Sequence, residues 1–142
     1  MKKIPFTTPK KLPFNSLYAL RSSLVENVGE RQFEIIDLFF KKGWAEGQDI
    51  GDPENLIKFL VEEGFPGEEI LDKVNSKEMR KALKVNVKEA LSRGVFGVPS
   101  FVVGHELFWG NDSIPYMESF LEQEDSLDVN KYEKFLRDYP FQ

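Results

Sequence analysis

The sequence predicts a mostly helical α/β protein with a single β-hairpin near its C-terminal end. Over residues 15–93, apolar side chains recur at spacings of three and four, which is the period of one face of a helix. Residues 94–112 differ, because two short runs of β-branched and aromatic residues flank a Gly-His pair. The 142 residues suit one globular chain, with 41% hydrophobic and 30% charged residues.

Residues 1–14 are expected to form an extended lead-in, because three prolines interrupt them. The lysines of this segment are dispersed, and we interpret it as a solvated arm. A helical insert over residues 15–93 follows. Asn15 is the expected N-cap of its first helix, which we predict to end at Gly29.

The segment from Glu30 to Trp44 is predicted to be the most apolar helix of the insert. We expect it to be buried on two sides, with Phe40 and Trp44 in the core. The apolar stripe and the residues that widen it are Phe33, Ile36, Phe40 and Trp44 with Ile35, Leu38 and Phe39.

Three further helices complete the insert. Asp52 and Pro53 are an N-cap followed by proline at the first helical position, and we expect that helix to end at Gly64. A short helix is predicted over residues 66–74. Ser76 is the expected N-cap of a longer one, which ends at Gly94.

The hairpin is predicted to pair residues 101–103 with residues 107–109. Gly104 and His105 supply a two-residue turn between the strands. Pro99 precedes the first strand, where a missing N–H is tolerated. The single histidine is therefore expected to be an exposed turn residue and not a metal ligand.

A last pair of helices is predicted after the hairpin. Asp112 or Ser113 is the expected N-cap of a helix that ends near residue 121, so residues 94–122 form one hairpin-and-helix segment. Residues 123–142 are predicted to add an extra amphipathic helix.

Several motifs in order resemble one protein family. GVFGVPSFVV at residues 94–103, followed by LFWGND, resembles the C-terminal signature of the DsbA-like branch of the thioredoxin superfamily. The likeness is to 2-hydroxychromene-2-carboxylate isomerases and kappa-class glutathione transferases. Residues 12–21 and 39–56 are similar to that family's helical insert, so the resemblance covers about residues 5–122. It implies a partial thioredoxin-like fold, with a helical insert followed by a β-hairpin and a C-terminal helix.

The resemblance also implies a glutathione site at Val98, Pro99, Asn111 and Asp112. In the family the proline is cis, the residue before it presents backbone groups to glutathione, and the corner after the second strand holds the γ-glutamyl end. The implied reaction is glutathione-dependent isomerisation of an aromatic carboxylate. No catalytic residue is assigned in this chain. A helix cap is the alternative role of Asp112, and the two roles are compatible.

The family further implies a β-α-β unit that carries the catalytic Ser or Cys ahead of the helical insert. No stretch of this sequence fills that role, so we expect the chain to be incomplete as an enzyme. A lone hairpin leaves unpaired backbone groups, which favours a homo-oligomer or association with a missing N-terminal half. The alternative function is a non-catalytic helical module that self-associates.

Composition limits the remaining chemistry. The chain has no cysteine, which excludes disulfides, thiolate zinc sites and dithiol redox reactions. A net charge of −5 argues against a nucleic-acid partner, and the lack of a long apolar run argues against a membrane, so a cytoplasmic location is expected. Trp109 is expected to pack in a core or within a subdomain, and lining a substrate pocket is the alternative. The acidic residues around Asp49 and Asp52 indicate a solvated turn rather than a cation site, and no metal is predicted.

Overall fold

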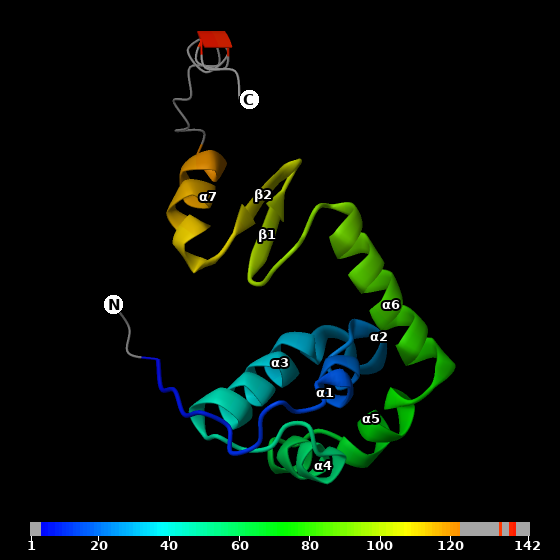
Figure 1. Cartoon of the computed structure of the whole chain (residues 1–142). Helices are drawn as coiled ribbons and strands as arrows, with labels where there is room; N and C mark the ends of the chain where they lie inside the picture. The colour runs from blue at the N-terminus through cyan, green and yellow to red at the C-terminus, as the bar shows by residue number, and fades with distance from the viewer. Residues whose placement is uncertain (1–3, 123–133, 135–136, 139–142) are drawn as a thin grey trace. The chain divides into compact units, whose positions relative to one another are not determined.

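The computed structural model describes residues 4–122 together with residues 134, 137 and 138 (Figure 1). It divides into two compact units, Met1–Lys88 and Glu89–Gln142, and each is treated by itself. The elements in chain order are α1 (Leu17–Ser22), α2 (Val25–Val28), α3 (Gln32–Phe40), α4 (Pro53–Glu62), α5 (Gly67–Val74), α6 (Lys77–Ser92), β1 (Ser100–Val103), β2 (Glu106–Trp109) and α7 (Ile114–Leu121). The predicted class, mostly helical with one hairpin and a C-terminal helix, is confirmed.

The first unit is built around one apolar core, to which α1, α3, α4 and α5 contribute (Figure 1). Helix α5 packs against both α4 and α1. Burial of each large aliphatic side chain in such a core stabilises a fold by about 1.5–3 kcal/mol. The buried side chains of this cluster are Ala19, Ile35, Leu38, Phe39, Ile50, Leu56, Phe59, Leu60, Phe65, Ile70, Leu71 and Val74.

The predicted first helix is two helices in the structure. The Oδ1 of Asn15 accepts a hydrogen bond of 3.1 Å from the backbone N–H of Leu17 at its start, as a cap would, although Ser16 occupies the N-cap position. The helix ends at Ser22, however, and the extended backbone of the buried Leu24 separates α1 from α2. Gly29 ends α2 with a φ of 59°. A bend at Leu24 buries that side chain, so the single helix to Gly29 was a wrong prediction.

The N-caps of α4 and α6 both make their side-chain hydrogen bonds. The Oδ1 of Asp52 accepts a hydrogen bond of 3.0 Å from Glu54 N, and Pro53 occupies the first position of α4. The hydroxyl of Ser76 accepts a hydrogen bond of 3.1 Å from Met79 N at the start of α6. These local caps fix where both helices begin.

The lead-in has no helix or strand in its described part, residues 4–14, as predicted. Most of this segment is exposed, as expected of a solvated arm. It is nevertheless attached to the first unit. The Phe6 ring stacks on Trp44 with 6.2 Å between centroids and 12° between planes. The backbone N–H of Thr7 donates to Trp44 O at 2.6 Å, and Pro9 is buried.

The buried face of α3 is not the predicted stripe. Ile35, Leu38 and Phe39 are buried, whereas Phe33 is 79% exposed and Phe40 is 63% exposed. Apolar residues surround most of this helix, so their periodicity could not indicate which side meets the core. The expectation that Phe40 lies in the core was wrong.

Helix α3 continues into a π-helical turn, Lys41–Ala45. The N–H of Glu46 donates to Lys41 O at 2.9 Å, five residues back instead of four. A wider turn rotates the side chains that follow it, so a spacing of four no longer aligns Phe40 with Trp44. Trp44 is half-buried, and Phe14 lies 6.2 Å from it at a tilt of 58°.

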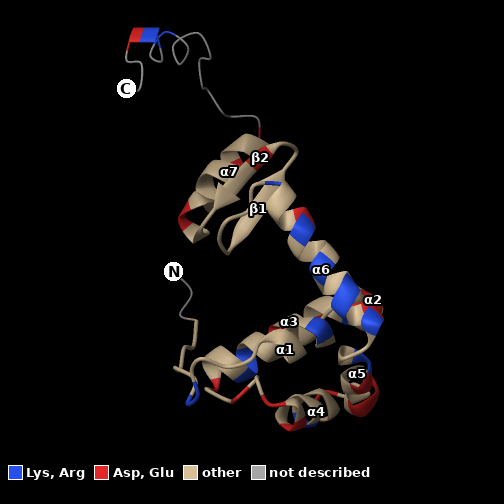
Figure 2. Cartoon of the chain, turned by 45° about the vertical axis from the view of Figure 1, so that its right-hand side comes forward, with Lys and Arg blue, Asp and Glu red and all other residues tan. Residues whose placement is uncertain are grey.

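Helix α6 carries charged residues along most of its length (Figure 2). Met79 is its only buried residue, while Val87 and Leu91 are 52% and 64% exposed. Apart from Met79, the apolar side chains of α6 are thus left at least partly in solvent. None of the helices in the described part of the chain is long and apolar enough to cross a membrane.

The second unit consists of the hairpin and α7. The strands pair in antiparallel register from Ser100 opposite Trp109 to Val103 opposite Glu106. The turn falls at Gly104, with a φ of 62°, and its exposed neighbour His105, as predicted. The extra helix predicted over residues 123–142 lies outside the described residues, apart from 134, 137 and 138.

The second unit has half-buried side chains but no buried ones between residues 89 and 122. The closest aromatic contact between α7 and the hairpin joins Phe120 to Phe108, with ring centroids 5.6 Å apart. Trp109 is 53% exposed and lies in no core, but its ring packs within the unit against Phe96. One helix on a two-stranded sheet cannot enclose a side chain from every direction.

Two neighbouring phenylalanines of α3 test this assignment of the core. Phe39→Ala should lower the free energy of unfolding by about 3–5 kcal/mol, through lost burial and the cavity that remains. Phe40→Ala should lower it by less than about 1 kcal/mol, because the ring is mostly in solvent. Denaturant unfolding followed by circular dichroism measures both, and equal losses would contradict the buried face described above.

Candidate functional site

One hydrogen bond joins the loop before β1 to the corner after β2. The N–H of Gly110 donates to Pro99 O at 2.9 Å, one step beyond the Ser100–Trp109 pair of the ladder. Val98 directly precedes Pro99, and Asn111 and Asp112 directly follow Gly110. All four residues predicted for the site therefore gather at the same end of the hairpin.

The loop side of the site presents backbone to solvent. The Val98–Pro99 peptide is cis, as the family resemblance led us to expect. The Val98 side chain is 88% exposed, and its residue lies outside the strand ladder. Beneath it, the hydroxyl of Ser100 donates to Gly97 O at 2.6 Å and anchors the loop. In the described part of the chain, no hydrogen bond uses the backbone N–H or C=O of Val98.

Trp109 supports this loop from below. A Cβ atom at position 97 would lie 2.5 Å from the indole Nε1 of Trp109, so only glycine allows this approach. The Phe96 ring lies 5.1 Å from the same indole at a tilt of 51°. The role of Trp109 is thus to hold the turn that precedes Pro99. The sequence signal for this role is the glycine immediately after Phe96.

The other side of the site is a tight corner at Gly110, with φ 88° and ψ 158°. This backbone region is essentially confined to glycine. The hydroxyl of Ser113 donates to Gly110 O at 2.8 Å, and a 3₁₀ turn over Asn111–Ser113 leads into α7. The glycine between Trp109 and Asn111 was the available sequence signal, and it did not distinguish this corner from an ordinary turn.

Asp112 does not cap α7 in the structure. The helix begins at Ile114 after Ser113, and no side chain makes a cap hydrogen bond there. Of the two predicted cap residues, Ser113 occupies the N-cap position, but the cap hydrogen bond expected of its side chain or that of Asp112 is not formed. Asp112 is exposed, with its Oδ1 close above Gly110. Its carboxylate is therefore free to accept hydrogen bonds from a ligand.

This arrangement can bind a ligand but shows no means of activating one. Asp112 offers a negative charge for an ammonium group, and Val98 offers a backbone donor and acceptor. His105 lies at the opposite end of strands that are each four residues long, which places it roughly 13 Å away. Among the described residues, no three His, Cys, Asp or Glu side chains gather as a metal site would require. Asp52 caps α4, and Asp49 Oδ1 accepts from Gly51 N at 2.9 Å.

Comparisons with known proteins agree on one family. The family model described as DSBA-like thioredoxin domain matches residues 1–122. A 2-hydroxychromene-2-carboxylate isomerase of Sphingobium xenophagum is 29% identical over 94 residues, which cover 66% of this chain and 48% of that protein. The chain thus spans about half the length of this relative. A solved structure of 2-hydroxychromene-2-carboxylate isomerase superposes with a TM-score of 0.68 at 21% identity, covering 89% of this chain and 62% of that one, and so has the same fold.

Substitution of Gly110 tests the corner. Gly110→Ala should strain the backbone by about 1–3 kcal/mol and push the new methyl group against Asp112. The amide at position 110 should then lose protection from hydrogen exchange. Gly104→Asn is the control, because asparagine tolerates the left-handed backbone of the hairpin turn. Unchanged protection at position 110 would show that the bond to Pro99 does not depend on this glycine.

Proposed function

The chain belongs to the family of DSBA-like thioredoxin domains, and we propose that it carries the glutathione-positioning part of an isomerase site of the 2-hydroxychromene-2-carboxylate type. The observation that carries this proposal is the bond from Gly110 N to Pro99 O, which joins the two halves of the site. The sequence likeness to an isomerase of this name supports the choice of reaction.

Each residue has a distinct role in this proposal. The backbone of Val98 pairs with the peptide groups of glutathione as an added strand would. Pro99 shapes the adjoining surface. Asp112 accepts hydrogen bonds from the ammonium group of the γ-glutamyl end, and Asn111 assists at the same end through its amide.

In this proposal, the residues that bind glutathione are not the residues that activate its thiol. The isomerisation requires glutathione to add to the aromatic carboxylate as a thiolate, to allow rotation about a bond, and then to leave. A thiol forms a thiolate near neutral pH only beside a positive charge or strong hydrogen-bond donors. Val98, Pro99, Asn111 and Asp112 supply no such group. The thiol-activating residue is therefore assigned to a part of the site outside these four residues.

Titration with glutathione tests the binding role. The chain alone should bind glutathione weakly, with a dissociation constant in the millimolar range, equivalent to about 4 kcal/mol. Asp112→Asn and Asp112→Ala should each weaken binding about tenfold or more, because a charged hydrogen bond is lost. Neither should change the free energy of unfolding by more than about 0.5 kcal/mol, since Asp112 caps no helix. NMR titration and chemical denaturation measure the two quantities.

Glu118→Gln is the matched control, because it removes an exposed carboxylate from α7 without touching the corner. Its affinity for glutathione should equal that of the wild type. If Asp112→Asn also binds as well as the wild type, the assignment of Asp112 is wrong. Turnover of a hydroxychromene carboxylate by the wild-type chain alone would instead refute the separation of recognition from chemistry.

The exposed surface of the second unit favours a second candidate function, which is self-association. No residue from 89 to 122 is buried, and the outer edge of each strand lacks a neighbour within the described sheet. Unpaired strand edges beside apolar faces promote pairing with another chain. The large apolar side chains exposed in this unit are Leu91, Phe96, Val98, Trp109, Tyr116 and Leu121.

Measurement of molar mass tests self-association. Light scattering across micromolar concentrations should give a dimer or a larger species for the wild type. Phe96→Ser should shift the equilibrium toward the monomer, because Phe96 is 71% exposed beside the hairpin. Phe33→Ser, at a 79% exposed position of the first unit, should leave it unchanged. A monomeric wild type would rule out this candidate.

A further inference from the structure

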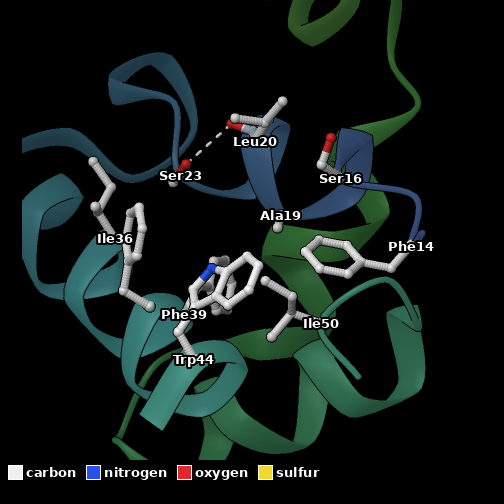
Figure 3. A pocket seen from close by; sticks show the side chains of 10 residues that line it. Phe14, Ser16, Ala19, Leu20, Ser23, Ile36, Phe39, Trp44 and Ile50 are labelled. Carbon is white, nitrogen blue, oxygen red and sulfur yellow. Dashed lines mark hydrogen bonds between the residues drawn. The ribbon is translucent and has the colours of Figure 1, made fainter. Parts of the chain in front are cut away.

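We propose that the first unit holds a second, independent binding site, for a small neutral molecule with a planar aromatic ring. The site is a cavity of about 340 Å³ that lies wholly among residues 14–50 (Figure 3). This volume is within the range of about 300–1,000 Å³ that is typical of small-molecule sites. The site shares no residue with the glutathione corner, so it neither requires that proposal nor supports it.

The cavity exists because a small residue faces large rings. Ala19 of α1 contributes only a methyl group, and Figure 3 shows it above the space between Phe14 and Trp44. The rings of Phe14 and Trp44 are tilted by 58° with 6.2 Å between centroids, so they do not close over each other. The π-helical turn after α3 places Trp44 at this wall. Phe39 and Phe40 complete an aromatic lining.

The lining indicates the class of ligand. Carbon atoms dominate it, and it includes no Lys, Arg, Asp or Glu side chain. A charged ligand would lose its hydration without gaining a partner, which is costly. An aromatic ring would meet several rings at offset or tilted angles, which is the favourable geometry for such pairs. The site therefore favours an uncharged arene.

The polar groups of the pocket allow one directional contact. Ser23 Oγ donates to Leu20 O at 3.1 Å, which is the hydrogen bond drawn in Figure 3. Ser16 is exposed at the rim. Among the described residues, no side-chain hydrogen bond is donated by the indole N–H of Trp44, so this group is available to a ligand oxygen. A hydroxyarene combines an aromatic face with such an acceptor, and a naphthol is close to the indole in size.

Fluorescence titration with 2-naphthol tests the site. The chain has two tryptophans, so Trp109→Phe makes Trp44 the sole reporter. We expect saturable quenching of Trp44 below about 1 mM, in keeping with the small size of the ligand. 2-Naphthoate has similar rings with a carboxylate, and its affinity should be at least about tenfold lower. Absence of saturable quenching by 2-naphthol, or equal affinity for the two compounds, would overturn the proposal.

Two phenylalanines of α3 form a matched pair for this test. Phe40 lines the cavity and Phe33 does not, yet both are mostly exposed, so neither alanine variant should unfold the unit. In the Trp109→Phe background, Phe40→Ala should weaken 2-naphthol binding about threefold to tenfold, the range for loss of one aromatic pair. Phe33→Ala should leave it unchanged. An equal loss in both variants would place the binding outside this pocket.

Discussion

The hydrogen bond from the Gly110 amide to the Pro99 carbonyl fixes the geometry on which the candidate site depends. The strand ladder ends at the Ser100–Trp109 pair. Without the Gly110–Pro99 bond, the ladder would not hold the loop before β1 beside the corner after β2. Its donor lies in a backbone conformation that glycine alone adopts readily. The hairpin thus holds two short exposed segments side by side, an apolar loop and a polar corner, although neither strand is itself enclosed.

The two units are stabilised in different ways. The first unit has a continuous core around fully buried residues such as Leu56 and Leu60, and its helices carry local caps. In its described residues, the second unit relies on one two-stranded ladder and on the packing of α7 against β2, which includes the Phe108–Phe120 contact. Regions with few buried contacts open at lower free energy than cores do. The candidate site therefore belongs to the less stable part of the chain.

The sequence predicted elements wherever the signal is local. Three predicted features depend on a few adjacent atoms, and all three are present. They are the hydrogen bonds that Asn15 and Asp52 accept at helix starts and the turn at Gly104. The buried side of α3 depends on which elements pack against it, and a helix that is apolar nearly all round does not encode that choice.

The residues of the site came from family resemblance, and the structure brings them together. Asp112 does not cap α7, because a 3₁₀ turn precedes the helix. The residue type of Asp112 does not predict that turn. Exposure also bears on how such a segment can persist through evolution. Substitutions at exposed positions usually change stability by no more than about 0.5 kcal/mol, so stability alone retains them weakly. Val98 is 88% exposed and Asp112 is exposed without a cap bond, yet both lie within the family signature. The stability of the fold therefore places little constraint on either position. In the proposal made above, contact with glutathione is the property that constrains them.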